Sequence, residues 1–251
     1  MAELSFYIPG FYESASVEVI KSIRRFYPHS SIIISSDAGP DYYNIAKEFN
    51  CQFVYFPDNL GYPEMPHGYK LDKALDWLKR LYTACVMSKG THIMIAEDDV
   101  SIINKITIED HWEIIAHDTT NYVPEFVLDL CYQYSGIRPS RPYYGAGGGT
   151  ILKIDTIINN YENIVKLFKV VFPQIQSVYP TIGWYDCYIT LFYFLCGKEY
   201  TVNKELYEIK GVHYDFDLES LDKTKYSVVH YYKNFYPKKF VTHTGEVNAH
   251  V

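Results

Sequence analysis

The sequence predicts an α/β fold with a mostly parallel central sheet flanked by helices. Three short apolar runs near the start of the chain have the length and the β-branched content of buried strands. Segments with helical spacing separate these runs, and such connections join parallel strands. A long helix pattern and a fourth buried strand follow, so we expect a Rossmann-like sheet in a single domain.

The elements are expected in alternating order. A strand at 4–8 precedes a helix through about residue 26, for which Ser14 or Ser16 is the expected cap. A strand at 31–36 precedes a helix over 40–49, and a third strand follows at 51–56.

The strongest helix pattern runs from Leu71 to Val86. Apolar residues recur at positions i, i+3, i+4 and i+7 and predict one buried face, while the charged residues, Arg80 among them, are expected on the exposed face. Gly90 ends this helix, and a fourth apolar strand follows directly.

Beyond residue 104 the patterns are weaker. Residues 143–154 are rich in glycine and lead into a strand, and 155–171 are expected to be helical. Residues 184–196 are very apolar, and we interpret them as a helix. The aromatic stretch 211–251 is expected to be irregular.

The fourth strand, 92–96, stops at three consecutive carboxylates, Glu97, Asp98 and Asp99. Adjacent acids repel one another and are costly to desolvate. Mg²⁺ or Mn²⁺, which prefer oxygen ligands, would remove that cost. The alternative is an ordinary solvated turn. The apolar flanks favour a ligand site, since ligands bind at the carboxyl ends of strands in open α/β sheets.

Composition excludes several classes of protein. The chain has 251 residues, 48% of them apolar, and a net charge of −7 without a long basic run, which argues against nucleic acid as partner. Its five cysteines lack CxxC spacing and predict reduced thiols of a cytoplasmic protein without zinc. Neither a signal peptide nor an apolar run of roughly 18 residues is present, so no transmembrane segment is expected.

Other charged residues stand at expected ends of elements. Asp37 follows the second strand, where it could bind a ribose or a base, or could cap the next helix. Lys70 and Lys73 begin the long helix, where they could bind phosphate or lie on a solvated face. Asp186 stands in an aromatic stretch, where burial would raise its pKa toward that of a general base, although it could equally cap a helix.

Two histidines and a glycine-rich segment complete the candidates. His213 and His230 could each supply a third metal ligand, and we prefer His230 because it follows a strand-like run, SVVH. The glycines at 145 and 147–149 allow a backbone to approach a ligand closely, or form a tight hairpin.

In this order, the segments YIPGFYE, SSDAG, AEDD, GAGGGTILK and GWYDCY resemble those of nucleotide-sugar-dependent glycosyltransferases with the GT-A fold. The resemblance covers about residues 4–235, and the chain looks like small stand-alone members from large DNA viruses or bacteria. It implies one domain over 1–251, with a nucleotide-binding half at 1–103 and an acceptor-binding half with a C-terminal tail at 104–251.

The resemblance also implies roles for the candidate residues. Asp99 would be the principal metal ligand and Asp186 the catalytic base of an inverting enzyme that uses Mn²⁺ or Mg²⁺. His230 remains our candidate for a further ligand because of its place in the sequence. The triplet EDD departs from a strict D-x-D, which leaves the roles of its first two acids open. The donor, with UDP as the expected nucleotide, would contact Pro9, Gly10, Tyr12, Asp37, Lys70, Lys73, Glu97, Asp98, Gly147, Gly148 and Gly149, and the carbohydrate acceptor would contact Trp184 and Tyr185.

Three other classes compete with this interpretation. A sugar-phosphate nucleotidyltransferase should carry a glycine- and arginine-rich loop after its first strand, where this chain has PGFYES. A phosphatase with an aspartyl nucleophile should have a second aspartate two residues after Asp37, where Gly39 stands. A non-catalytic module with a nucleotide pocket differs from an enzyme only in failing to hydrolyse or transfer the donor.

Overall fold

The structure is a computed structural model. It describes residues 3–10, 12–36, 41–57, 71–116, 118–140, 143–145, 147–179, 185–198, 221–222 and 224–230. For 118–121, 143–145 and 185–186 the description covers the backbone only.

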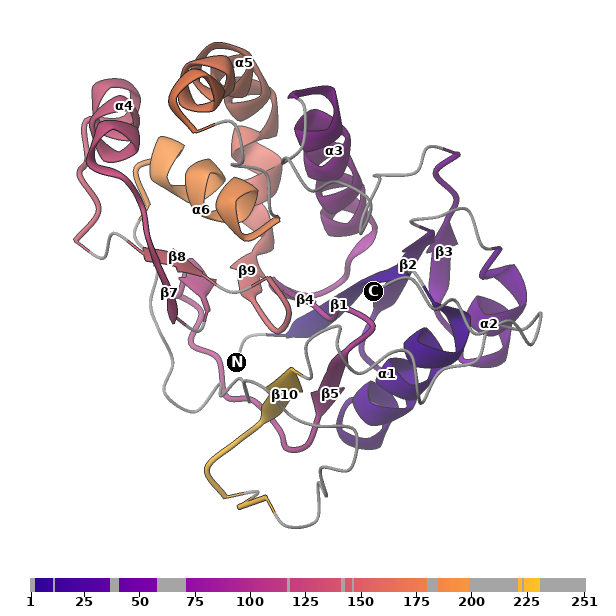
Figure 1. Cartoon of the computed structure of the whole chain (residues 1–251). Helices are drawn as coiled ribbons and strands as arrows, with labels where there is room; N and C mark the ends of the chain where they lie inside the picture. Colours follow the sequence, from indigo (N-terminus) through magenta and orange to yellow (C-terminus); the bar gives the residue numbers. More distant parts are fainter. Residues whose placement is uncertain are drawn as a thin grey trace.

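A six-stranded sheet with the order β3-β2-β1-β4-β9-β6 forms the centre of the molecule (Figure 1). Its strands are β1 (Leu4–Gly10), β2 (Ile32–Ser36), β3 (Gln52–Val54), β4 (His92–Ile95), β6 (Ile114–Ile115) and β9 (Ile151–Lys153). The neighbours from β3 to β4 pair in parallel, whereas β9 pairs antiparallel with both β4 and β6. The predicted mostly parallel sheet is therefore confirmed.

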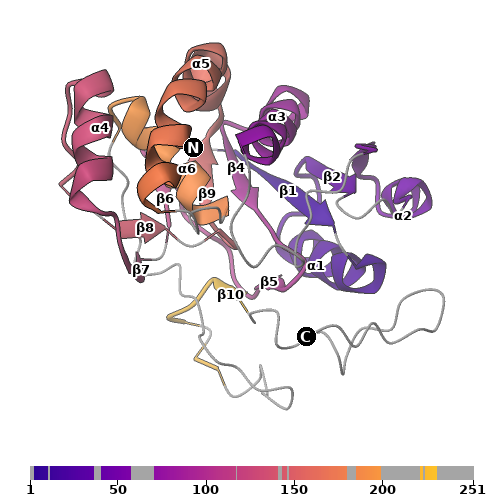
Figure 2. The ribbon, with the colours of Figure 1, turned by 45° about the horizontal axis from the view of Figure 1, so that its top comes forward.

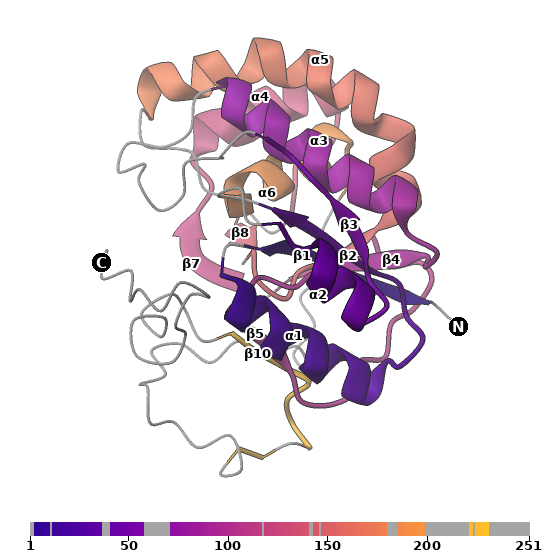
Figure 3. The same cartoon turned by 90° about the vertical axis from the view of Figure 1, so that its right-hand side faces the viewer.

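Helices cover both faces of this sheet. They are α1 (Glu13–Phe26), α2 (Tyr43–Glu48), α3 (Leu71–Met87), α4 (Glu125–Ser135), α5 (Ile154–Val178) and α6 (Tyr185–Leu195). In Figure 1, α1 and α2 lie below the sheet and α3 to α6 lie above it. Figure 3 shows that α5 runs alongside α3 over the upper face.

The strands are apolar on both sides, which explains why they read as continuous hydrophobic runs. In β1, Phe6 and Ile8 belong to the core with α1 and α2, while Tyr7 between them belongs to the core with α3, α5 and α6. In β4, Met94 belongs to the core with α1 and α2, and Ile95 belongs to the core with α3, α5 and α6. This alternation, which follows from the two-residue period of a strand, fixes the register of the sheet between two separate cores.

Two small antiparallel pairs flank the main sheet. Strand β5 (Val100–Ile102) pairs with β10 (Val228–His230) close to α1, as Figure 2 shows. Strand β7 (Asp118–Tyr122) pairs with β8 (Tyr143–Gly145). The strand β10 corrects the expectation of an irregular segment over 211–251, of which 221–222 and 224–230 are described.

Several local expectations were wrong. The cap of α1 is Tyr12, without a side-chain hydrogen bond, so neither serine caps this helix. Helix α2 begins at Tyr43, and α5 continues past residue 171 to Val178 with Pro173 inside it. Arg80, expected on the exposed face of α3, is only 1% exposed.

All five cysteines carry free thiols, as the sequence predicts. Burial raises the pKa of Cys51 to about 11 and that of Cys131 to about 12, so both thiols stay protonated at neutral pH. Within the part of the chain that the structure describes, no helix combines the length and the hydropathy needed to cross a bilayer.

Candidate functional site

The candidate site is built on a turn at the carboxyl end of β4. The amide of Ala96 donates to the carbonyl of Tyr7, which continues the parallel pairing, and the amide of Val100 then donates to the carbonyl of Glu97 at 3.0 Å. Asp98 and Asp99 therefore occupy the centre of a tight turn that redirects the chain into β5.

The three carboxylates of this turn are buried, at 8%, 4% and 3% exposure for Glu97, Asp98 and Asp99. The alternative of a solvated turn is therefore wrong. Burying several carboxylates in one place is unfavourable unless hydrogen-bond donors or a cation compensate them.

His230 approaches two of these carboxylates from the C-terminal part of the chain. It pairs with Val100 in the β5–β10 register, which places it beside the turn. Its Nε2 lies 3.2 Å from Oδ1 of Asp99 and 3.7 Å from Oε2 of Glu97. One ligand atom from each of these three buried side chains lies within 4.8 Å of the others. Two carboxylate oxygens and one imidazole nitrogen form a donor set suited to a divalent cation.

Asp98 makes a different contact. Its Oδ2 accepts a hydrogen bond from the amide of Tyr12 at 3.1 Å, and Tyr12 caps α1. A carboxylate at a helix N-terminus satisfies an amide that has no partner within the helix and interacts favourably with the helix dipole. Asp98 thereby joins the turn after β4 to the start of α1.

The glycine-rich segment at 147–149 packs against His230. A Cβ atom on Gly148 would lie 2.9 Å from Cε1 of His230, closer than packed side chains allow. Gly149 has φ +86°, and its amide donates to the carbonyl of Ile95. Both glycines are thus required where the backbone passes from its turn into β9 beside the carboxyl end of β4.

The end of β1 is held in a similar way. Pro9 and Gly10 pair with Ser35 and Ser36 at the end of β2. A Cβ atom on Gly10 would lie 2.8 Å from the ring of Tyr42, which is fully buried at the start of α2. Glycine therefore lets the tyrosine pack directly on the last residue of β1.

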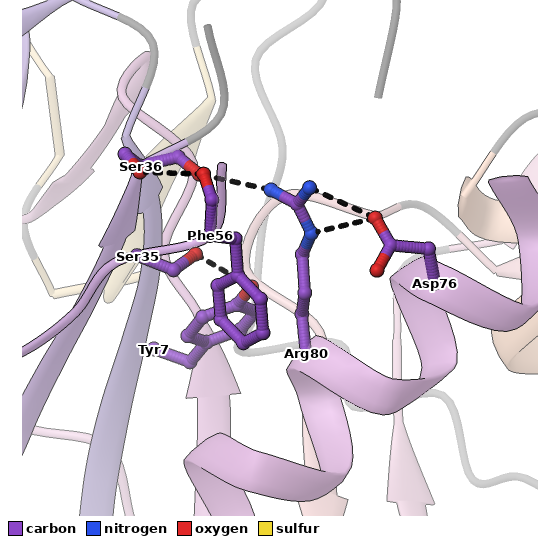
Figure 4. Close-up of polar contacts among 6 residues, drawn as sticks. All are labelled: Tyr7, Ser35, Ser36, Phe56, Asp76 and Arg80. Atoms are coloured by element: carbon purple, nitrogen blue, oxygen red, sulfur yellow. Dashed lines mark hydrogen bonds and ion pairs between the residues drawn. The ribbon is translucent and has the colours of Figure 1, made fainter. Parts of the chain in front are cut away.

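A polar cluster lies between α3 and the carboxyl ends of β1, β2 and β3 (Figure 4). The hydroxyls of Tyr7 and Ser35 are 2.8 Å apart. The buried guanidinium of Arg80 donates to the carbonyl of Ser36 and to the carboxylate of Asp76. Sequence reasoning missed this cluster, because a single charged residue in an amphipathic helix gives no sign that a partner lies across the core.

The remaining predicted residues are described in part or not at all. Asp37, Lys70, Trp184 and His213 lie outside the described residues. Tyr185 and Asp186 form the beginning of α6, without a description of their side chains. Lys73 lies in the first turn of α3 and is half-buried.

No protein-family model matches this sequence, and no curated protein matches it either. Solved structures do match its fold. The galactosyltransferase LgtC, in complex with donor and acceptor sugar analogs, aligns with a TM-score of 0.51 and 16% identity over 90% of this chain and 86% of its own. Mouse xyloside xylosyltransferase 1 aligns with a TM-score of 0.49 and 9% identity over 93% of this chain and 99% of its own.

Staphylococcus aureus TarS aligns with a TM-score of 0.38 and 16% identity over 63% of this chain, which spans 29% of the length of TarS. At these identities the likeness concerns the fold, and the alignment with LgtC extends over most of both chains. The chain has a GT-A-like glycosyltransferase fold, as the sequence predicts.

Proposed function

We propose that this protein is a glycosyltransferase that depends on a divalent metal and moves a sugar from a nucleoside-diphosphate sugar to a hydroxyl group of a carbohydrate acceptor. The observation that supports this most strongly is the buried set of Glu97, Asp99 and His230 at the carboxyl end of β4. It lies in a fold shared with LgtC, which was solved with donor and acceptor sugar analogs.

The chemistry of the donor set favours one ion over another. Mg²⁺ prefers oxygen ligands in near-ideal octahedral geometry, whereas Mn²⁺ accepts carboxylates and the nitrogen of His230 together. The side chain of Asp99 is fully buried and its oxygen lies 3.2 Å from the imidazole, so this residue is the expected principal ligand. Mn²⁺ is therefore the first ion to test, with Mg²⁺ as the alternative. When bound, the ion would neutralise the charge that develops on the departing nucleoside diphosphate.

The residues around this set would bind and orient the donor. The carboxyl ends of β1 and β2, where Pro9 and Gly10 pair with Ser35 and Ser36, are the expected contacts of the nucleoside, together with Asp37, which follows Ser36 in the sequence. Lys73 in the first turn of α3, and Lys70, which precedes this helix in the sequence, would interact with its phosphates. Tyr12, Glu97, Asp98 and the glycines 147–149 would lie near the ribose and the transferred sugar.

Acceptor activation is assigned to Asp186 from the sequence. A carboxylate in an aromatic stretch is poorly solvated, which raises its pKa and suits a general base that deprotonates the acceptor hydroxyl. Trp184 and Tyr185 would pack on the acceptor sugar. Single displacement with such a base inverts the anomeric centre, by the geometry that inverting glycosidases use.

The variant Asp186→Asn keeps the shape of the side chain and removes the base. Transfer should fall by about 10²–10⁴, the usual contribution of general base catalysis, while donor and metal affinity stay close to the wild-type values. Chromatographic assay of the product measures the rate, and NMR of its anomeric proton gives the configuration. Near-normal transfer by Asp186→Asn, or retained configuration in the wild-type product, would remove Asp186 from this role.

The decisive experiment is a screen of nucleotide sugars, beginning with UDP-sugars, for thermal stabilisation and for hydrolysis in the presence of Mn²⁺. A ligand that binds the native state must raise its melting temperature. Stabilisation together with metal-dependent release of the nucleoside diphosphate supports an enzyme. Stabilisation without any turnover, tested across acceptors, would favour the non-catalytic module, and hydrolysis unaffected by EDTA would contradict the metal site.

A further inference from the structure

A buried arginine connects α3 to the ends of β2 and β3, as Figure 4 shows. Nη1 of Arg80 donates to the carbonyl oxygen of Ser36 at 2.8 Å. Its Nε and Nη2 donate to Oδ2 of Asp76 at 3.1 and 2.8 Å, one turn earlier on the same helix. The guanidinium also lies over the ring of Phe56, with its carbon 4.8 Å from the ring centroid. One side chain therefore contacts both strand ends from a third element.

The surroundings of Arg80 make a charge unexpected there. Its neighbours on the buried face of α3, Trp77, Leu78 and Leu81, belong to the apolar core above the sheet. A buried cation is costly to desolvate, and apolar side chains of similar size often give equal or better stability. Packing alone therefore does not explain an arginine, and the groups it holds provide a better reason.

Those groups lie at the edge of the sheet where a nucleotide is expected. Ser36 is the last residue of β2 and directly precedes Asp37 in the sequence. Phe56 follows β3, and its carbonyl accepts a hydrogen bond from the hydroxyl of Ser36 at 3.4 Å. Arg80 donates to the carbonyl of Ser36 at the end of β2, and its guanidinium packs on the ring of Phe56 after β3. Arg80 thus links the two strand ends, in addition to the pairing of Ser35 with Val54.

We propose that Arg80 is a positioning residue for the nucleoside of the donor. It holds the carboxyl ends of β2 and β3 in the arrangement that receives the nucleoside, and it does not contact the reacting atoms. This inference rests on the proposed function. Loss of such preorganisation weakens donor binding equally in the ground state and in the transition state, so KM should rise while kcat stays nearly constant.

The chain offers a matched control at the opposite ends of the same two strands. Arg24, on α1, donates to the carbonyls of Ser30 at 2.7 Å and of Asn50 at 2.8 Å, just before β2 and β3 begin. Both arginines therefore use guanidinium donors to fix backbone carbonyls beside β2. Only Arg80 does so at the edge where the donor would bind.

The test compares the wild type with Arg80→Met, Arg80→Lys and Arg24→Met. Calorimetry with Mn²⁺ present gives the Kd for UDP, steady-state assays give donor KM and kcat, and thermal denaturation reports folding. We expect Arg80→Met to raise the Kd for UDP and the donor KM by about tenfold, consistent with the loss of charged hydrogen bonds, with kcat within about twofold. Arg80→Lys should recover part of this loss, and Arg24→Met should bind UDP as the wild type does even if its melting temperature falls.

Each outcome decides the matter. A folded Arg80→Met variant with wild-type affinity for UDP overturns the inference, as does an Arg24→Met variant that loses as much affinity as Arg80→Met. If Arg80→Met does not fold, Arg80→Lys takes its place, and wild-type affinity in that variant overturns the inference. If the wild-type protein binds no nucleoside diphosphate, the proposed function itself is contradicted. If the wild type binds UDP and Arg80→Met binds it equally well, only the role of Arg80 is contradicted.

Discussion

An arginine and a histidine lie beside each end of the central sheet, but they have different partners at the two ends. At the amino ends, Arg24 donates to backbone carbonyls before β2 and β3. His92, the first residue of β4, lies with its Nε2 2.8 Å from the carbonyl oxygen of Trp112 and its Nδ1 3.0 Å from the hydroxyl of Thr91. These partners of Arg24 and His92 are neutral.

At the carboxyl ends the partners include acids. Arg80 pairs with Asp76, and His230 contacts Asp99 and Glu97. Neutral acceptors at the amino ends satisfy the hydrogen-bond donors of Arg24, which serves stability. Buried carboxylates at the carboxyl ends carry a free-energy cost that a bound cation would offset. Under the proposed function, stability and ligand binding would be separated along the direction of the strands.

The largest expected effect is at the carboxyl end. Asp99→Asn should reduce metal-dependent transfer by about 10³-fold or more, because a metal supplies several kcal/mol of charge stabilisation and each 1.4 kcal/mol is a factor of ten. Transfer assays with added Mn²⁺ measure the loss, and circular dichroism checks that the variant is folded. Wild-type activity that survives extensive dialysis against EDTA would show that this end of the sheet does not work through a metal.

A smaller effect at the same end should come from Gly148→Ala. The new methyl group would lie 2.9 Å from the ring of His230 and must displace it from the carboxylates. Groups that orient a metal ligand typically change metal affinity by about 10–100-fold, so a loss of this order in Mn²⁺ affinity is expected by calorimetry.

Gly136→Ala provides the control for Gly148→Ala, because Gly136 ends α4 outside the site and its Cβ would meet open space, although its φ of +72° adds backbone strain. This control should lose stability without losing affinity for Mn²⁺. Equal Mn²⁺ affinity in the wild type and in a folded Gly148→Ala variant would contradict the packing of Gly148 on His230.

The smallest effect belongs to the amino end and concerns pH. Burial lowers the pKa of His92 below its usual value of 6.5, although the hydrogen bond to the carbonyl of Trp112 acts in the opposite direction. The unfolded chain therefore binds more protons than the folded chain just below pH 6.5. The free energy of unfolding contributed by His92 is fully present above that pH and falls as the pH drops toward the folded pKa.

Urea denaturation at pH 7.5 and 5.5 measures this contribution. The loss of stability between the two pH values should be smaller in His92→Gln than in the wild type. His111, whose side chain is 74% exposed, provides the control, and His111→Gln should lose stability as the wild type does. Identical losses in His92→Gln and the wild type would show that His92 does not contribute to this pH dependence.

The sequence predicted the parts of the fold that depend on local patterns. The strands β1, β2 and β4 are recognisable because both faces are buried, and α3 because its apolar residues repeat with helical spacing. The burial of Arg80 was not predictable from this spacing, since its partners come from β2 and the segment after β3. A charged residue is assigned to the exposed face by default, and only tertiary contacts reverse that assignment.

In the candidate site, too, local patterns predicted some features and tertiary contacts decided the others. The end of a buried strand identified Glu97, Asp98 and Asp99 as candidates, and the short apolar run before His230 favoured it over His213. The structure brings His230 to Asp99 through the pairing of two three-residue strands, β5 and β10. Strands this short carry almost no propensity signal, and a pairing between distant segments leaves no local pattern in the sequence.

Because β5 pairs with β10, the proposed ion would also affect the thermal stability of the chain. An ion held by Asp99 and His230 would act as a reversible cross-link that closes a loop of about 130 residues, for which the chain-entropy estimate is about 4–5 kcal/mol. The melting temperature should then depend on the concentration of free metal. A chain shortened to end before residue 230 would keep both carboxylates but lose the cross-link, so its stability should no longer respond to chelators.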